Sequence, residues 1–196
     1  MSFGSLGIAH LEARGAVAPR WLLWIGAREF GTLADASIGL WNGDDDLTFT
    51  IDGSPRIYNG ALGMFEVEPI VYATGTDVRT QRITLSANTP EVEDVFRGFV
   101  VKNAPVELHL ALMEPLTGAV IDINRMFKGF LNRAPMATAA MGSGGTSVAA
   151  EMVSSMRLLT LATAEKKTDQ SHRQRSSDRF RRYGAVAGKT TAEWDK

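Results

Sequence analysis

Apolar and polar residues alternate along much of the chain, and a two-residue period is typical of strands with one buried face. Residues 47–51 (Leu-Thr-Phe-Thr-Ile) alternate throughout. Residues 105–113 alternate more strictly, with apolar side chains at every even position from 106 to 112. We expect those even positions to face the core, and Glu107 and His109 to lie on the opposite, polar face of the strand.

Turn signals separate such strands. Asn-Gly and three aspartates at 42–46 precede residues 47–51, and Asp52-Gly53 follows them. Because both signals suit tight turns, residues 47–58 are predicted to form a β-hairpin. Pro69 falls within another predicted strand, which favours an edge or a bulge there. The other predicted strands are 21–25, 38–41, 64–72, 79–87, 120–123 and 126–131.

Few segments have a helical period. Residues 6–14 predict a short, weakly amphipathic helix. Residues 89–97 predict a second one, which begins with a Thr-Pro-Glu cap sequence and ends before Gly98. Residues 146–163 fit either a helix or a long strand. The pattern as a whole predicts a mostly β fold, a barrel or sandwich of short antiparallel strands with a few short helices.

Charge divides the chain into two parts. The 196 residues carry 21 Lys and Arg against 22 Asp and Glu, for a formal net charge of −1. Residues 1–164 have a net charge of −5, whereas residues 165–196 have a net charge of +4. We therefore predict a β-rich domain over 1–164 and a basic C-terminal interaction segment over 165–196.

The chain contains no cysteine. This excludes disulfides, thiolate zinc sites, cysteine-ligated iron–sulfur clusters and a cysteine nucleophile, and we expect no cofactor. The longest apolar stretches, such as 21–25 and 158–162, are far shorter than the roughly 20 residues of a membrane-spanning helix. The N-terminus also lacks the apolar run of a secretory signal. We therefore expect no membrane partner.

Two acidic groups raise the question of catalysis or metal binding. Glu66 and Glu68 lie two residues apart on a predicted strand, so both carboxylates would face one side, as in a small carbohydrate hydrolase. We favour a solvent-facing or interface-facing strand, because no other feature indicates a cleft. Residues 44–46, with Asp52 nearby, offer oxygen ligands for a hard cation. Their spacing differs from that of helix–loop–helix calcium sites, and a solvated turn fits it better.

The remaining candidates for chemistry are weaker. His10, His109 and His172 lie far apart without a paired-histidine motif, so we predict structural or exposed roles for them. Residues 142–145 (Gly-Ser-Gly-Gly) lack the Lys-Ser/Thr of a phosphate-binding loop and predict a flexible turn. The sequence therefore predicts no catalytic, cofactor-binding or metal-binding residue.

A basic stretch with two aromatic residues lies in the C-terminal segment. Arginines bind phosphates and aromatic rings stack on bases, so nucleic acid is one candidate partner. Acidic residues are interleaved with these arginines, however, and Arg–carboxylate pairs with the acidic domain of a neighbouring copy are equally good chemistry. We favour a subunit interface over nucleic-acid binding, with Arg173, Arg175, Arg179, Phe180, Arg181, Arg182, Tyr183 and Trp194 as its residues.

Six short motifs follow one another along the chain. They are the acidic turn and Leu-Thr-Phe strand of 41–49, the Asp-Gly … Tyr-Asn-Gly … Leu-Gly pattern of 52–63, Ile-Thr-Leu-Ser-Ala at 83–87, Phe-Lys-Gly-Phe-Leu at 127–131, the arginine-rich stretch 172–183, and 189–194 ending in Trp. In this order they resemble the tail-tip or baseplate hub family of tailed phages, which also occurs in gene transfer agents.

This resemblance implies a structural virion protein rather than an enzyme. Members of the family form a β-barrel-based ring at the distal end of the tail, where the ring joins a hexameric tube to a trimeric tip. For this chain the resemblance implies self-association into a trimer, with a hexamer as the alternative. It also implies contacts with the distal tail or tube protein and with tip or fibre proteins, in a virion assembled in the host cytoplasm.

The chain departs from the family pattern in two respects. Some members continue past the tryptophan into a second domain whose cysteines hold a metal cluster. Because this chain ends at Lys196 and has no cysteine, we expect a short form without that domain and without a cluster. Ala87 and Ser177 stand where the family typically has glycine, so we expect those two turns to differ.

Overall fold

The computed structural model describes most of the chain up to residue 160 and isolated positions beyond it. The chain's contacts divide it into two compact units, Met1–Leu158 and Leu159–Lys196. No helix among the described residues is both long and apolar enough to cross a membrane. The described residues are 3–61, 65–72, 75–86, 90–138, 145–160, 169–170, 173, 177, 179–180 and 182–183.

The first unit consists mainly of strands, so the predicted mostly β class with a few short helices is confirmed. The elements follow one another as α1 (Ser5–Glu12), β1 (Ala18–Glu29), β2 (Asp35–Trp41), β3 (Leu47–Ile51), β4 (Ser54–Gly60), β5 (Phe65–Val67), β6 (Thr80–Ser86), α2 (Pro90–Gly98), β7 (Phe99–Val100), β8 (Pro105–Met113), β9 (Val120–Arg133), β10 (Met136–Ala137), β11 (Ser147–Ser154) and α3 (Arg157–Thr160).

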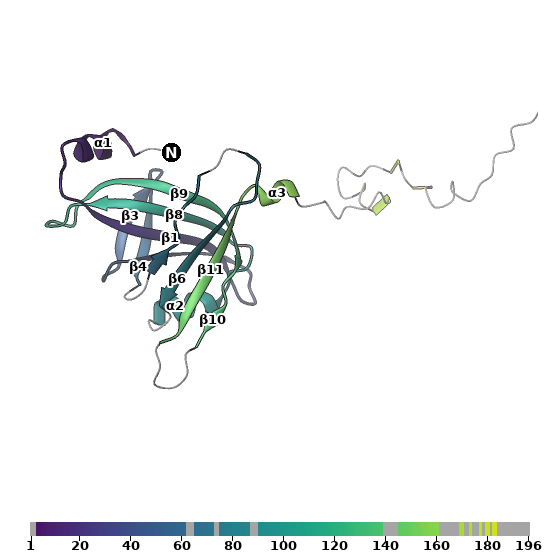
Figure 1. Ribbon diagram of the computed structural model, residues 1–196. Coiled ribbons are helices and arrows are strands. Elements are labelled where there is room, and N and C mark those ends of the chain that lie inside the picture. Colours follow the sequence, from purple (N-terminus) through teal and green to yellow (C-terminus); the bar gives the residue numbers. More distant parts are fainter. Residues whose placement is uncertain are drawn as a thin grey trace, which may run out of the picture. The chain divides into compact units, whose positions relative to one another are not determined.

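All the strands belong to one strongly curved sheet (Figure 1). Its order is β3-β4-β2-β1-β8-β9-β11-β6-β5, and β7 and β10 pair at the sides with β1 and β11. Neighbouring strands are antiparallel except β2 and β4, which are parallel. In the described residues no pairing joins β3 to β5, so the sheet has two unlike edges.

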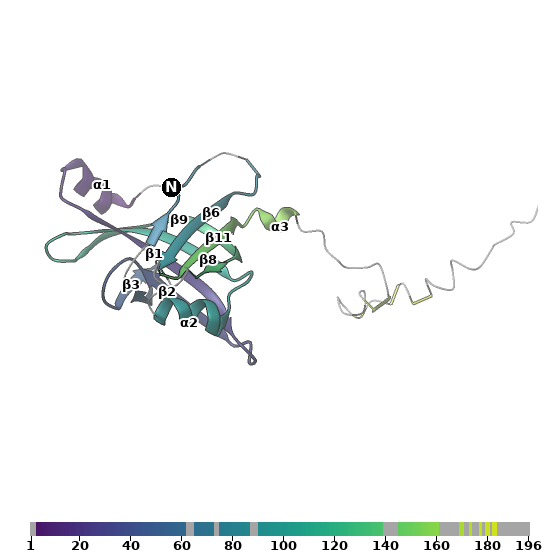
Figure 2. The same cartoon turned by 60° about the horizontal axis from the view of Figure 1, so that its bottom comes forward.

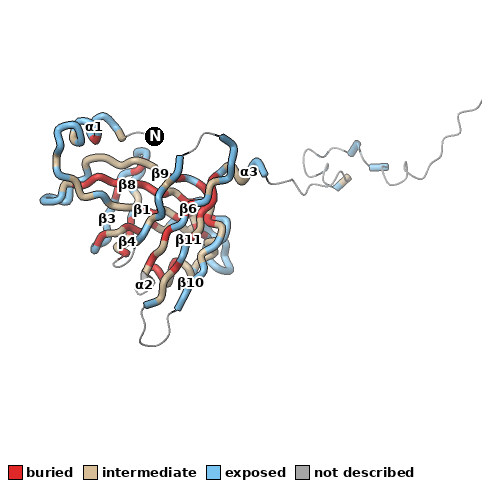
Figure 3. The backbone as a smooth tube through the Cα atoms, in the orientation of Figure 1, coloured by how far each residue is buried: buried red, intermediate tan, exposed pale blue. Residues whose placement is uncertain are grey.

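The main core lies inside the curve of this sheet. Leu23 and Ile25 of β1, Val106 and Leu108 of β8 and the buried residues of β6 and β11 meet there. Helix α2, which comes forward in Figure 2, adds Val92 to the same cluster. Buried backbone therefore runs along the central strands, whereas turns and hairpin tips are exposed (Figure 3).

A second, aromatic core lies on the other face of β1. Leu22 faces it, together with Trp41, Phe49 and Tyr58. The ring of Phe49 meets those of Trp41 and Tyr58 edge-on, with centroids 5.4 and 5.5 Å apart. The predicted hairpin is confirmed as β3 and β4, and its two turn residues both have positive φ, 49° at Asp52 and 79° at Gly53. Because this hairpin covers the second face, β1 is buried on both sides.

Three expected elements have different bounds in the structure. The strand predicted over 64–72 ends at Val67, because Pro69 has no N–H to extend the ladder with β6. The two pieces predicted over 120–131 form one long strand, β9. The ambiguous stretch 146–163 is a strand over 147–154 and a helical turn over 157–160.

The helix expected near the N-terminus is present as α1, but its apolar side chains point outward. Gly7 is its buried residue, and it packs against Asp122 of β9 so closely that a Cβ would overlap that carboxylate. Asp122 also accepts a hydrogen bond from the Gly4 backbone N–H at 2.6 Å. Leu6 remains 74% exposed, so α1 is fastened to the sheet by its glycines and presents leucines to the outside.

Candidate functional site

An ionic cluster around the largely buried carboxylate of Glu107 joins the β3–β4 hairpin to the sheet. Glu107 of β8 accepts a hydrogen bond from the Arg56 guanidinium of β4 at 2.7 Å, and the Lys128 ammonium of β9 lies 3.1 Å from its other oxygen. Arg125 is 3.7 Å from both Glu107 and Asp52. The Arg56 guanidinium also stacks 5.0 Å from the ring centre of Trp24. The Glu107 side chain is only 12% exposed.

The cluster fixes the charge of its carboxylate. Burial by itself would raise the pKa of Glu107, but hydrogen bonds and charge from Arg56 and Lys128 lower this pKa to about 2. Burial has the largest single effect on the pKa of Arg56 and lowers it, but the hydrogen bonds and charges of Glu107 and Tyr58 together outweigh burial, so this pKa is raised. A carboxylate that stays ionised and is held by several cations is suited to fastening two strands together, not to general acid catalysis.

His109 is a buried neutral imidazole beside this cluster. The alternation of 105–113 places it opposite the main core, as predicted. The expected half-buried strand was wrong, because the hairpin covers this face as well. His109 is 2% exposed, so of the two roles expected for it, structural or exposed, it has the structural one. Burial lowers the pKa of His109 to about 4, Glu107 opposes this shift, and the cations Arg56 and Arg125 reinforce it. Burial likewise raises the pKa of the Tyr58 hydroxyl to about 12.

The acidic turn at 42–46 has structural contacts. The Asn42 side chain accepts a hydrogen bond from the Trp21 backbone N–H at 2.8 Å. The Trp41 indole N–H donates to the Asp45 carbonyl at 2.7 Å, and the Asp46 carboxylate accepts from the Gly60 N–H at 3.1 Å. These bonds hold the turn against β1 and β4. Within the described part of the chain, no group of three or more His, Asp or Glu is arranged to hold a metal ion.

The carboxylates weighed for hydrolase chemistry lie on an open edge of the sheet. Glu66 and Glu68 are both exposed at β5. Glu68 is 3.9 Å from Arg82 of β6, and Arg82 in turn lies 3.5 Å from Glu151 of β11. Neither Glu66 nor Glu68 lines a described pocket. A glycoside hydrolase holds its two carboxylates on either side of the bound sugar, and none of these described pockets places Glu66 or Glu68 in that way.

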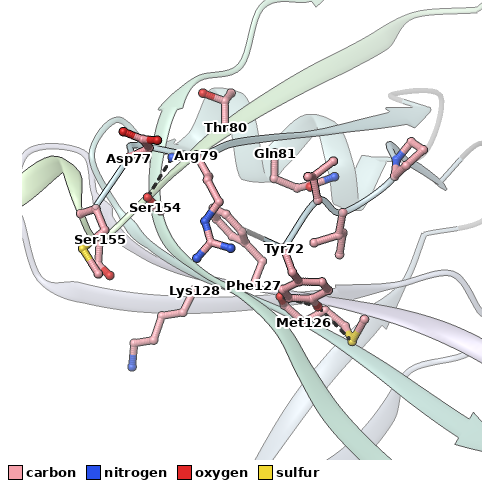
Figure 4. A pocket seen from close by; sticks show the side chains of 14 residues that line it. Tyr72, Asp77, Arg79, Thr80, Gln81, Met126, Phe127, Lys128, Ser154 and Ser155 are labelled. Carbon is pink, nitrogen blue, oxygen red and sulfur yellow. Dashed lines mark hydrogen bonds between the residues drawn. The ribbon is translucent and has the colours of Figure 1, made fainter. Parts of the chain in front are cut away.

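A pocket of about 410 Å³ opens where three segments meet (Figure 4). Residues 69–72 and 77–81 form one side, residues 126–128 of β9 form the floor, and 154–156 at the end of β11 close it. The Tyr72 hydroxyl donates to the Met126 carbonyl at 3.1 Å. The backbones of Arg79 and Ser154 are bonded to each other, at 2.8 Å from the Ser154 N–H, so two of the walls are fixed.

The predicted interface residues lie in the second unit, where the structure describes five of them. Arg173 and Arg179 line one pocket with Gln170 and Ser177. Phe180 is 84% exposed, and the Arg182 guanidinium lies 5.3 Å from the ring centre of Tyr183. Arg175, Arg181 and Trp194, as well as His172, the expected loop at 142–144 and Ala87, lie outside the described residues.

Ser177 has a φ of +57°, a conformation that glycine adopts most readily. Its backbone N–H donates to the Arg173 carbonyl at 2.9 Å, as at the end of a helical turn. The turn at this position therefore holds its serine in the left-handed conformation.

Sequence reasoning missed both the ionic cluster and the pocket. The cluster joins residues of β4, β8 and β9, and the pocket joins loop residues near 70 and 79 with β9 and β11. Only one signal pointed to the cluster, the two polar residues Glu107 and His109 within a strongly apolar strand. Nothing in the local pattern of residues 69–81 indicated a pocket.

Comparison with known proteins gives a likeness in fold to a virion protein. No protein-family model matches the chain, and no curated protein matches it. Among solved structures, its fold is similar to that of a chain in the virion of a native gene transfer agent particle, with a TM-score of 0.52 and 18% sequence identity. The match covers 85% of this chain and 50% of that chain, so this chain spans about half the length of its structural neighbour.

Proposed function

We propose that this chain is a structural protein of a phage-like virion. In this proposal it forms a ring at the distal tail tip, as a baseplate hub, and joins the tail tube to the tip or fibre proteins. A trimer is the expected ring, with a hexamer as the alternative. The protein acts by assembly and catalyses no reaction.

One observation carries the proposal: 85% of the chain shares its fold with a chain of a gene transfer agent virion. The six ordered motifs supply separate support, because they come from the sequence and resemble a family found in the same kind of particle. Two of the motifs contain a glycine at a position where the structure leaves no room for a side chain. Gly43 lies under the Trp41 ring in the acidic turn, and Gly129 lies against β11.

The surface of the first unit suits a subunit of an assembly. The sheet has two unlike edges, β3 and β5, and unpaired edges are usually covered in stable proteins. Large apolar side chains are also exposed, with Leu6 of α1 at 74% and Leu116 of the β8–β9 turn at 95%. Contacts with neighbouring subunits would remove both features from water.

The basic C-terminal segment, residues 165–196, supplies complementary charge in this proposal. Its net charge of +4 meets a net charge of −5 on residues 1–164 of a neighbour. The residues we assign to this contact are Arg173, Arg175, Arg179, Phe180, Arg181, Arg182, Tyr183 and Trp194.

Sedimentation velocity of the purified chain tests the self-association. We expect a species of three or six times the monomer mass of 21.3 kDa. Charge reversal at Arg179 and Arg182 should shift it toward monomer, whereas reversal of Arg28, an exposed arginine on β1, should not. A strictly monomeric wild type, alone and in isolated tail tips, would contradict the proposal. DNA binding through residues 173–183 that weakens steeply with salt would instead favour the nucleic-acid alternative.

A further inference from the structure

The surface of the 410 Å³ pocket beside β9 is mainly apolar, although polar and apolar residues contribute equally to its lining. Val71 and Tyr72 lie at its rim, where they are 73% and 53% exposed. Phe127, in contrast, is buried and forms part of the floor. Hollows of this size with aromatic and aliphatic walls bind a large apolar group, and such groups are the anchors of protein interfaces.

Three charged residues, Asp77, Arg79 and Lys128, are among those that line the pocket, and Arg79 gives it a preference for a negatively charged group. Arg79 is half-buried, and Figure 4 shows its side chain directed into the pocket while Lys128 points away. Lys128 is already paired with Glu107 at 3.1 Å. Within the part of the chain that the structure describes, the Arg79 guanidinium has no ion pair. The pocket thus offers an apolar cavity beside a guanidinium, which suits an aromatic side chain next to a carboxylate.

An aromatic side chain adjoins a carboxylate at several places in the sequence, but only Trp194 has one on both sides. Three of its four tryptophans lie on β1 and β2, and the fourth, Trp194, stands between Glu193 and Asp195. Trp194 is about 38 residues beyond Met156 at the pocket wall, and a chain of this length spans up to about 130 Å when extended. The segment is therefore long enough to reach another subunit.

We propose that the pocket of one copy receives Trp194 of a second copy, with Glu193 or Asp195 of that copy paired to Arg79. This inference rests on the proposed assembly of copies into a ring. In a head-to-tail ring each subunit donates one segment and offers one pocket, so every pocket is filled when the ring closes. The unlike edges of the sheet fit the same head-to-tail arrangement.

A peptide-binding experiment tests the chemistry of the pocket. The probe is a fluorescein-labelled peptide of residues 188–196, and its target is the full chain carrying Trp194→Ala, which leaves the pockets unoccupied by this residue. We expect saturable binding by fluorescence anisotropy. Adding Arg79→Met should weaken it about ten- to a hundredfold, the effect of losing a charged hydrogen bond, while adding Arg28→Met should leave it unchanged.

Arg79→Met removes the charge but keeps the aliphatic stem and the backbone bonds to Ser154, so it should fold. Circular dichroism and the unfolding midpoint check this. A peptide with alanine in place of tryptophan should not bind. Absence of binding to a folded target, or binding that Arg79→Met does not change, would overturn the inference.

A mixing experiment tests whether the tryptophan in the pocket comes from a second copy of the chain. Full chains carrying Arg79→Glu keep the donor segment, and full chains carrying Trp194→Ala keep the pocket. Mixed in equal amounts, they should form a one-to-one complex that neither forms alone. Failure to form it would mean that the pocket is filled from within the same chain or not at all, and either result overturns the second-copy assignment. The proposed function fails separately, if the wild-type chain is absent from purified particles.

Discussion

His109 should make the stability of the first unit strongly dependent on pH. Its pKa is about 4 in the folded chain, against 6.5 for an ordinary histidine. Because the folded-state pKa is the lower one, the unfolded chain binds the additional proton between these values, and stability falls as pH falls through this window. With about 1.4 kcal/mol for each pKa unit, the loss is about 1 kcal/mol between pH 7.5 and 5.5 and about 2–3 kcal/mol by pH 4.5.

Glu107 contributes little to this slope above pH 4.5. Its pKa is also lower in the folded chain, about 2 against an ordinary 4.5, so the stability it supplies is lost only as pH falls below 4.5. The range from pH 7.5 to 5.5 therefore separates His109 from the ionic cluster. Burial is the largest cause of the shift, so the effect should persist in high salt.

Urea unfolding at pH 7.5, 6.5 and 5.5 measures this effect. The control variants are His109→Leu and His109→Asn, which differ in packing but both lack the imidazole. Between pH 7.5 and 5.5, the free energy of unfolding of each variant should fall by about 1 kcal/mol less than that of the wild type. This difference does not depend on how stable the variant is at pH 7.5. An equal pH dependence of the free energy of unfolding in the wild type and both variants would show that His109 is not the cause.

Three further predictions concern stability and are measured by urea unfolding. Glu107→Gln should cost about 2–4 kcal/mol, because it leaves the largely buried Arg56 guanidinium without a full counter-charge, and combining it with Arg56→Met should cost less than the sum; strict additivity would contradict the pairing. Gly129→Ala should cost about 1–3 kcal/mol, because the new Cβ meets backbone of β11. Gly98→Ala, where nothing lies within 4 Å, is its control, and equal effects would contradict the steric argument. Leu33→Asn should stabilise the chain by up to about 1 kcal/mol, because Leu33 is exposed and has a φ of +55°; a lower midpoint would contradict this.

The local pattern predicted elements well where one turn signal bounded one alternating run. The hairpin of 47–58 has both features, and it forms as predicted with Asp52-Gly53 at its tip. The pattern failed where local cues conflicted with long-range pairing. Residues 120–133 contain polar interruptions, yet pairing with β8 and β11 holds them in one strand.

The alternation of apolar and polar residues could not predict that the second face of a strand is also buried. A strand with one polar side looks half-buried in sequence, but whether another element covers that side depends on how the chain folds back. The hairpin supplies this cover over β1 and β8, and Glu107 and His109 become buried polar groups for that reason. A polar group that is covered in this way needs either a partner or a neutral state. Glu107 is paired with cations, and His109 is neutral.

The candidate sites depended even more on tertiary structure. The spacing of Glu66 and Glu68 correctly predicted two exposed carboxylates, but only the fold shows that neither of them lines a described pocket. The pocket at Arg79 requires loop residues, β9 and the end of β11 together. The likeness in fold to a virion chain at 18% identity also shows that few identical residues are needed for this architecture.

Cryo-electron microscopy of purified particles can show directly whether this chain is a ring subunit of the distal tail. We expect density for the curved sheet, with the β3–β4 hairpin on its outer face, in three or six copies around the axis at the distal end of the tail. Mass spectrometry of the same particles should detect the chain. Its absence from intact particles, or its presence as a single copy away from the tail tip, would rule out the proposed function.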